Sequence, residues 1–197
     1  MGTDKKIKVC HLISGDLWAG AEAQITILLS QLSKEKHLEN FALIYNQGKL
    51  AEELKRLNLS LCILEERENN SLKLFIKTYR WLKHQGVDLV HSHRYKENII
   101  GSLAAKMGGI DHIIRTYHGM PEPFGGFKNI KYKFYIFLDY LISKLLVKKI
   151  IAVSFEIKKK LSQRLSEKKI TSIPNSINLD SLKIKKPPQR VREILGI

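Results

Sequence analysis

The sequence has few cysteines and no apolar run long enough to cross a membrane. Its two cysteines, Cys10 and Cys62, lie inside apolar segments, and neither has a second sulfur at metal-ligand spacing. We therefore expect buried, reduced thiols and no zinc–cysteine site. The longest apolar stretch, residues 134–147, is interrupted by polar and charged residues and is shorter than the roughly 20 residues that a membrane-spanning helix needs.

Acidic residues are scarce as well. Asp and Glu number 19 against 34 Lys and Arg, which gives a net charge of +15 and a pI near 9.8. Such a surface attracts phosphates, anionic lipid or nucleic acid, and charge alone does not choose among them. The polar start, residues 1–6, lacks the apolar segment of a secretory signal. We expect a cytoplasmic protein, with peripheral attachment to the inner face of the cell membrane left open.

Three ligand-binding motifs are missing. The chain has neither the dinucleotide fingerprint G-x-G-x-x-G nor a P-loop, which argues against NAD and against an ATPase. It also has no Asp-x-Asp pair of the kind that holds a metal on a diphosphate. We therefore expect no metal and no cofactor.

Seven short runs rich in Ile, Val and Leu alternate with amphipathic stretches. This alternation is typical of strands and crossover helices in a parallel sheet. It predicts an α/β fold: a Rossmann-like, doubly wound, mostly parallel sheet of about seven strands with flanking helices. The expected strands are 7–13, 41–45, 59–64, 87–91, 113–117, 150–153 and 170–173. Residues 1–181 form the predicted domain, and the basic, Pro-containing residues 182–197 are interpreted as a linker that enters a missing C-terminal domain.

The first predicted strand is followed by a glycine-bearing loop. In a doubly wound sheet, ligands bind beyond the carboxyl ends of the strands. Gly15 and Gly20 permit tight turns there, and exposed amides near Ala21 could hold a phosphate at the start of the next helix. An ordinary strand-to-helix turn explains the loop equally well. Glu22 lies in the first helical turn, where capping is favoured over ligand contact.

Two histidines follow the fourth predicted strand. His91 and His93 are two residues apart and so share a face, which makes a two-histidine metal site conceivable, but the sequence offers no evident third ligand. Hydrogen bonding is favoured over metal binding. Core packing is favoured for His91, whereas His93 and Arg94 lie nearer the strand end and are candidate site residues.

His118 is the preferred functional residue. It follows the fifth predicted strand, beside Gly119, which allows a sharp turn of the backbone. An imidazole there can accept a proton or donate a hydrogen bond to developing charge, although a structural histidine is the alternative. Arg115 points to the other face, as an ion-pair partner would.

Residues 128–149 predict a basic helix with an apolar stripe. Two roles are open for it: packing on the sheet with its lysines in solvent, or lying on an anionic membrane near a lipid-linked acceptor. Packing is slightly favoured, because the stripe is needed to cover the sheet.

The order of these motifs resembles the N-terminal domain of retaining glycosyltransferases of family 4, which have the two-domain GT-B fold. The similarity covers nearly the whole chain, from residue 7 to residue 197. The motifs that carry it are Ala19-Gly20-Ala21-Glu22, His91-Ser92-His93, Thr116-Tyr117-His118-Gly119, Ile151-Ala152-Val153-Ser154 and Ile173-Pro174-Asn175-Ser176-Ile177-Asn178. Three residues depart from the family pattern: Ala19 replaces a glycine, Lys148 an acidic residue and Ser176 a glycine.

The resemblance implies a glycosyltransferase of hexosyltransferase type. It would move a sugar from a nucleotide-sugar donor to a polysaccharide, glycolipid or lipid-linked oligosaccharide with retention of configuration, using neither metal nor cofactor. His118 would lie beside the transferred sugar as the catalytic residue. The expected substrate-binding residues are Gly15, Ala19, Gly20, Ser92, His93, Arg94, Gly119 and Asn175. Because most donor contacts in the family come from the C-terminal domain, this fragment alone is expected to be inactive.

Three other functions are carried as alternatives. A GT-B sugar-nucleotide epimerase shares the architecture. A nucleic-acid-binding module would suit the positive charge, but the lysines are dispersed and no recognition motif or set of base-stacking aromatics accompanies them, so no nucleic-acid partner is expected. A membrane-surface module without catalysis is the third.

Overall fold

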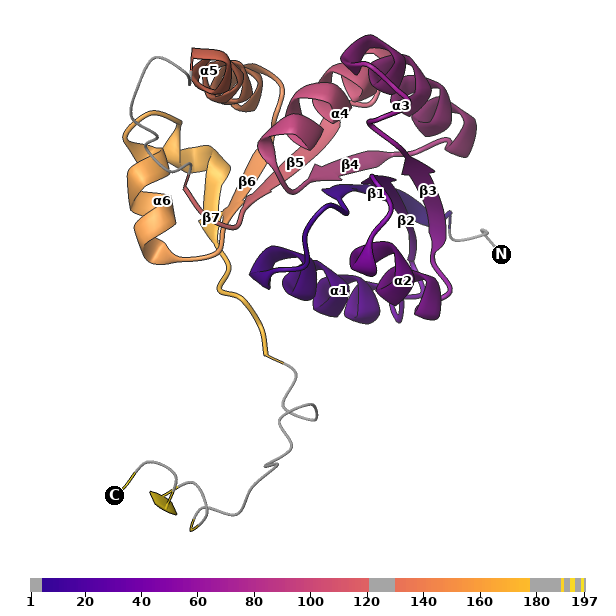
Figure 1. The fold of residues 1–197 in the computed structure, drawn as a ribbon. Coiled ribbons are helices and arrows are strands. Elements are labelled where there is room, and N and C mark those ends of the chain that lie inside the picture. The colour runs from indigo at the N-terminus through magenta and orange to yellow at the C-terminus, as the bar shows by residue number, and fades with distance from the viewer. Residues whose placement is uncertain (1–4, 121–129, 178–188, 190–191, 194–195, 197) are drawn as a thin grey trace.

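The described part of the chain forms a seven-stranded sheet with helices on both faces (Figure 1). The computed structural model describes residues 5–120, 130–177, 189, 192–193 and 196. Every pair of neighbouring strands is parallel, and the spatial order is β3-β2-β1-β4-β5-β6-β7. The strands are β1 (Ile7–Ser14), β2 (Leu38–Tyr45), β3 (Ser60–Leu64), β4 (Leu89–Ser92), β5 (His112–Tyr117), β6 (Lys149–Ala152) and β7 (Ile170–Ser172). The predicted fold class and all seven predicted strands are confirmed.

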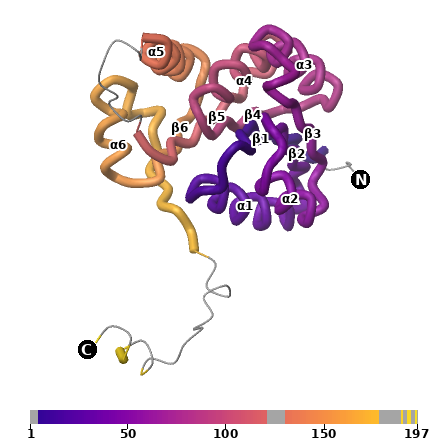
Figure 2. Tube along the Cα trace, in the orientation of Figure 1, coloured from indigo at the N-terminus to yellow at the C-terminus, as the bar shows by residue number. Residues whose placement is uncertain are grey.

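Helices connect the strands as crossovers and divide between the two faces (Figures 1 and 2). One core cluster packs α3, α4, α5 and α6 against one face, and a second packs α1 and α2 against the other. The helices are α1 (Gly20–Leu32), α2 (Lys49–Arg56), α3 (Ser71–Gln85), α4 (Tyr95–Met107), α5 (Ile130–Leu145) and α6 (Phe155–Ser162), with a short 3-10 turn η2 (Glu167–Lys169) before β7.

Local sequence signals fix where several helices begin and end. The side chain of Asn70 accepts a hydrogen bond from the Lys73 amide at the start of α3, and Gly86 ends that helix in the left-handed region at φ 64°. Ser154 caps α6 by accepting from the Ile157 amide at 3.2 Å, as its position before the helix predicts. α6 therefore starts just beyond the carboxyl end of β6.

The two faces of the sheet are covered unequally. Of the helices in the described residues, α1 and α2 pack against β1, β2 and β3, and none packs over β4, β5 and β6 on that same face. A largely apolar cavity of about 470 Å³ lies there instead, walled by α1 on one side and by residues 173–176 on the other. The cavity is where a ligand can reach the carboxyl half of the sheet.

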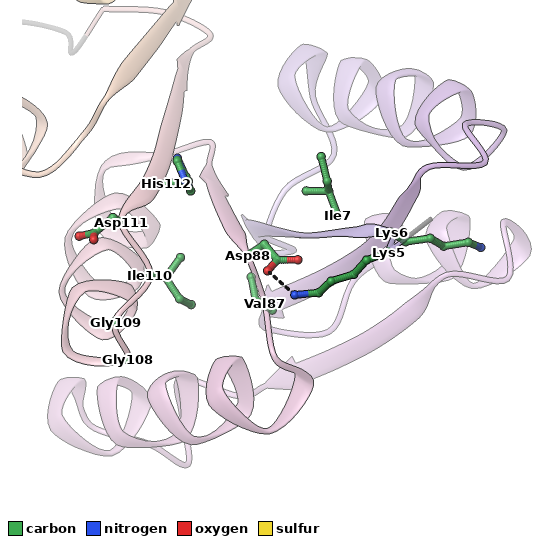
Figure 3. Close-up of a pocket in the computed structure, with 10 residues that line it drawn as sticks. All are labelled: Lys5, Lys6, Ile7, Val87, Asp88, Gly108, Gly109, Ile110, Asp111 and His112. Atoms are coloured by element: carbon green, nitrogen blue, oxygen red, sulfur yellow. Dashed lines mark ion pairs between the residues drawn. The ribbon is translucent and has the colours of Figure 1, made fainter. Parts of the chain in front are cut away.

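A second cavity, of about 560 Å³, lies at the opposite edge of the sheet. Figure 3 shows that its walls come mainly from the segments that lead into β1, into β4 and into β5. Lys5, before β1, forms an ion pair with Asp88, before β4, at 3.9 Å. None of the residues that the sequence singled out lines it. In parallel α/β sheets ligands bind at the carboxyl ends of strands, so this amino-end cavity is not the candidate site.

The expectation of two buried cysteines is confirmed for one of them, and the expected C-terminal linker lies mostly outside the described residues. Cys10 is buried as expected, but Cys62 is only half-buried. Most of residues 182–197, the expected linker and domain entry, lie outside the described residues. Across the part of the chain that the structure describes, no helix combines the length and apolar character of a membrane span.

Candidate functional site

A row of four histidines lies on the open face of the sheet. His11 of β1 stands opposite His91 of β4 in the parallel register, and His93 and His118 follow the ends of β4 and β5. Nδ1 of His11 is 3.3 Å from Nε2 of His93, and Nδ1 of His93 is 3.2 Å from Nε2 of His118. His91 bonds through Nε2 to the Thr116 hydroxyl at 2.8 Å. Adjacent ring nitrogens therefore form a continuous chain from the sheet interior to His118.

Burial keeps this row uncharged. Desolvation lowers the pKa of His11 and of His118 to about 4 in each case, and it holds the pKa values of His91 and His93 well below their ordinary value. For His118, nearby Glu22 opposes that shift and Arg94 adds to it. At neutral pH each imidazole has one N–H and one lone pair, so His118 can donate or accept a hydrogen bond but does not supply a positive charge.

An ion pair joins the start of α1 to the start of α4. The guanidinium of Arg94 bonds to Oε1 of Glu22, whose other oxygen accepts from the Ala19 amide at 3.0 Å. Glu22 is fully buried, and its capping role is confirmed. Arg94 and His118 follow the carboxyl ends of the neighbouring parallel strands β4 and β5, and α1 begins beyond the same end of β1. Gly20, which begins α1, and His118 thus lie at the same edge of the sheet, as a shared binding site requires.

The segment after β7 is fastened across α1 by two hydrogen bonds. Gln24 donates from Nε2 to the Ser176 carbonyl at 2.8 Å and accepts from the Ser176 amide at 3.0 Å. Asn175, beside this contact, lines the cavity together with His93 and His118. The structure therefore brings together three expected site residues that are distant in sequence.

The expected glycines play different roles. A Cβ on Gly15 would lie 2.1 Å from the backbone oxygen of Asn46, so only glycine fits between the loops that follow β1 and β2. A methyl group added at Gly20 or at Gly119 would meet nothing within 4 Å, and neither residue has a positive φ. The sharp turn expected at Gly119 is therefore not a left-handed one. Ala19 and Gly20 are exposed, so their backbone is open to a ligand.

Ser92 is the expected site residue that the structure places elsewhere. Its hydroxyl donates to Oδ1 of Asn98 at 3.1 Å on the opposite, helix-covered face. Arg115 lies on that face too, paired with Asp139 of α5 in a buried network that includes Ser143, which confirms its role as an ion-pair partner. Ser92 thus contributes to packing between β4 and α4 and not to the histidine row.

Sequence reasoning missed two residues of the site. His11 is a third imidazole beside His91 and His93, and no third ligand was evident from the sequence. The sequence does show His11 as a polar residue inside an apolar run. That His11 lies beside His91 and His93 becomes evident only when β1 and β4 are known to be neighbours. Gln24 had no signal, because a polar residue on a helix is ordinary.

Helix α5 buries only part of its expected apolar stripe. Its buried residues are Asp139, Ile142 and Ser143, whereas Phe134 and Phe137 are 59% and 60% exposed. Ile130 and Leu145 continue the exposed stripe at helical spacing. The prediction that the apolar stripe covers the sheet therefore holds only in part: Ile142 is buried, and Leu138 and Leu141 are half-buried. The polar face of α5 that meets the buried Arg115 turns the rest of the stripe to solvent.

Comparisons with known proteins agree with this architecture. The model of a family described as Glycosyltransferase Family 4 matches residues 18–181. An Escherichia coli UDP-Gal:alpha-D-GlcNAc-diphosphoundecaprenol alpha-1,3-galactosyltransferase is 26% identical over 184 residues, which are 90% of this chain and 47% of that protein. The chain therefore spans about half the length of this relative.

Two solved structures share the fold. Anabaena Alr3699/HepE in complex with UDP superimposes with a TM-score of 0.75 and 15% identity, over 96% of this chain and 50% of that one. A UDP-N-acetylglucosamine 2-epimerase superimposes with a TM-score of 0.65 and 14% identity, over 98% of this chain and 61% of the other. At such identities the superpositions establish the fold alone.

Proposed function

Because the chain belongs to glycosyltransferase family 4, we propose that it forms the acceptor-side half of an enzyme that transfers a hexose from a UDP-sugar to a lipid-linked acceptor. The donor class is supported by the UDP bound to the Anabaena structure, and the acceptor class by the name of the Escherichia coli relative. Transfer proceeds with retention of anomeric configuration, uses no metal, and requires a second domain. The chain alone is inactive.

One observation carries this proposal: His118 lies at the carboxyl edge of the sheet and lines an open cavity together with Gln24 of α1 and Asn175. Amides at a helix start favour negative charge, so the exposed backbone at Gly20 suits a phosphate of the donor or acceptor, whereas the Ala19 amide already donates to Glu22. Arg94, tied to Glu22, adds a cation whose position is fixed. This edge can thus hold an anionic group while His118 faces the sugar.

His118 acts as a neutral hydrogen-bonding group. Its Nε2 is engaged by His93, and its Nδ1 has no hydrogen-bond partner among the described residues. An unpaired buried nitrogen costs free energy until a ligand satisfies it. A hydroxyl of the transferred sugar supplies that partner, and the hydrogen bond strengthens as charge develops in the transition state.

Acceptor-dependent release of UDP tests the proposal. The complete polypeptide that contains this chain is incubated with UDP-galactose, UDP-glucose or UDP-N-acetylglucosamine, with and without GlcNAc-diphosphoundecaprenol. We expect one donor to give a lipid-linked disaccharide and UDP only when the acceptor is present. The chain ending at residue 197 serves as the matched control and releases no UDP.

An epimerase is the second candidate, supported by the similar fold of the 2-epimerase. It would convert a UDP-sugar to its epimer with no acceptor present. Such turnover, or the absence of acceptor-dependent UDP release with all donors, would contradict the transferase.

The exposed stripe of α5 suggests how the enzyme reaches a lipid-linked acceptor. Phe134 and Phe137 face away from the core, and the exposed lysines Lys131, Lys133 and Lys144 lie beside them. Aromatic side chains enter the acyl boundary of a bilayer, and each lysine near an anionic surface contributes about 1 kcal/mol. The proposed enzyme is therefore peripheral, with α5 on the anionic inner face of the membrane.

Changing Phe134→Ser together with Phe137→Ser should weaken binding to phosphatidylglycerol-containing vesicles about tenfold or more, because the apolar area that enters the bilayer is lost. Vesicle co-sedimentation measures the effect. Leu72→Ser on α3 is the matched control, since Leu72 is 65% exposed on a different helix. Equal binding by the double variant and the control would rule out α5 as the contact.

A further inference from the structure

We propose that the row of histidines contains a binding site for a late first-row divalent metal ion such as Zn²⁺ or Co²⁺, held by His11, His91 and His93. One ring nitrogen from each residue lies within 4.8 Å of the other two. All three residues are buried on one face of the sheet. The site joins β1 to β4, and the ion would touch neither substrate nor His118, the residue proposed above to act in sugar transfer.

The spacing of two of these nitrogens already matches a tetrahedral ion. Zinc–imidazole bonds of 2.0–2.1 Å at a tetrahedral angle put two ligand nitrogens about 3.3 Å apart. Nδ1 of His11 and Nε2 of His93 are 3.3 Å apart. One ring nitrogen of each of the three residues lies within 4.8 Å of the others, so the most widely separated nitrogens need to approach by about 1.5 Å at most to complete the trigonal face.

The surroundings give the ion a path and an open fourth position. His11, His91 and His93 all line the 470 Å³ cavity, so an ion can enter from solvent and keep one water there. A site made only of imidazoles selects Zn²⁺, Co²⁺, Ni²⁺ or Cu²⁺ over Mg²⁺ and Ca²⁺, which prefer oxygen ligands.

Metal binding also has a consequence for His118. An ion on Nε2 of His93 leaves Nδ1 as the N–H, and this N–H donates to Nε2 of His118 at 3.2 Å. His118 then carries its own proton on Nδ1. The ion thus fixes the tautomer of His118 through His93, without contacting His118 itself.

Titration of the metal-free protein with Co²⁺ tests the site. We expect one equivalent to bind with the intense visible d–d bands of tetrahedral coordination, and Zn²⁺ to displace it. His11→Gln and His93→Gln should each weaken binding at least about 100-fold. His84→Gln, on the exposed side of α3, should leave it unchanged. A hundredfold excess of Zn²⁺ over the Kd should raise the Tm by about 5 °C or more.

A measurement on the unaltered protein covers the case in which a variant does not fold. Zn²⁺ should shift the imidazole ¹⁵N resonances of His11, His91 and His93 strongly, and those of His37, His84 and His112 little. No bound ion at millimolar metal, octahedral-type Co²⁺ spectra, or equal binding by folded His11→Gln would overturn the proposal and leave a purely hydrogen-bonded row. None of these readouts requires sugar transfer, so this inference and the proposed function fail separately.

Discussion

Replacing His118 by alanine should lower the kcat of the complete enzyme about 100-fold or more. The imidazole lies at the carboxyl edge of the sheet beside Glu22 and Arg94, with Nδ1 unpaired among the described residues. A hydrogen bond made to developing charge in the transition state is worth about that factor. Since the contact strengthens mainly in the transition state, kcat falls more than KM rises. Initial rates at saturating donor and acceptor measure the effect.

The stability of the variant has to be followed in parallel, because His93 loses the partner of its Nδ1. We expect a cost of about 1–3 kcal/mol in the free energy of unfolding, which leaves the enzyme folded at assay temperature. His84→Ala, at an exposed position of α3, is the control for loss of an imidazole as such. An unchanged kcat in folded His118→Ala enzyme would remove His118 from the mechanism and leave it a structural residue.

Asp139→Ala should be the most destabilising of the simple substitutions. Asp139 pairs with the Arg115 guanidinium and accepts from Asn98 at 2.9 Å, and the side chains of Asp139 and Arg115 are 3% and 4% exposed. Removing the carboxylate leaves a buried cation without its partner, at a cost of about 3–5 kcal/mol. For a domain of this size the Tm should fall by about 6–20 °C. Urea and thermal unfolding give both values.

Two controls separate the buried charge from loss of packing. The double variant Arg115→Met with Asp139→Leu removes both charges and should recover most of the stability, because an apolar pair of similar volume fits the site. Asp111→Ala breaks an exposed ion pair with Lys106 and should have little effect. If Asp139→Ala unfolds no more readily than Asp111→Ala, the network does not hold α5 in place.

The elements of this fold could be read from the sequence because each strand is a short, mainly apolar run. Parallel strands buried on both faces need such runs, and all seven strands of the sheet coincide with one. The order of the strands could not be read in the same way, since a crossover helix can place the next strand on either side. Only that order sets His11 beside His91, which is why the sequence alone does not reveal the third imidazole.

Helix α5 illustrates a different limit. Periodicity reveals that Phe134 and Phe137 share a face but not whether that face points inward. The answer depends on Arg115, whose burial on β5 requires the polar side of α5 to face it. Likewise, the two hydrogen bonds between Gln24 and Ser176 join residues 152 positions apart, and no local sequence pattern predicts them. His93, Arg94 and His118 could be placed because they follow strand ends directly.

The central position of β1 has a consequence for biosynthesis. β1 leaves the ribosome before β2 and pairs with it soon afterwards, but its other edge stays unpaired until β4 is made, since Val9 aligns with Leu89, which is 80 residues later. Until then the nascent chain presents an apolar strand with unsatisfied backbone groups, which is the kind of edge on which chains aggregate. Efficient production should therefore depend on chaperone protection during synthesis of the first half.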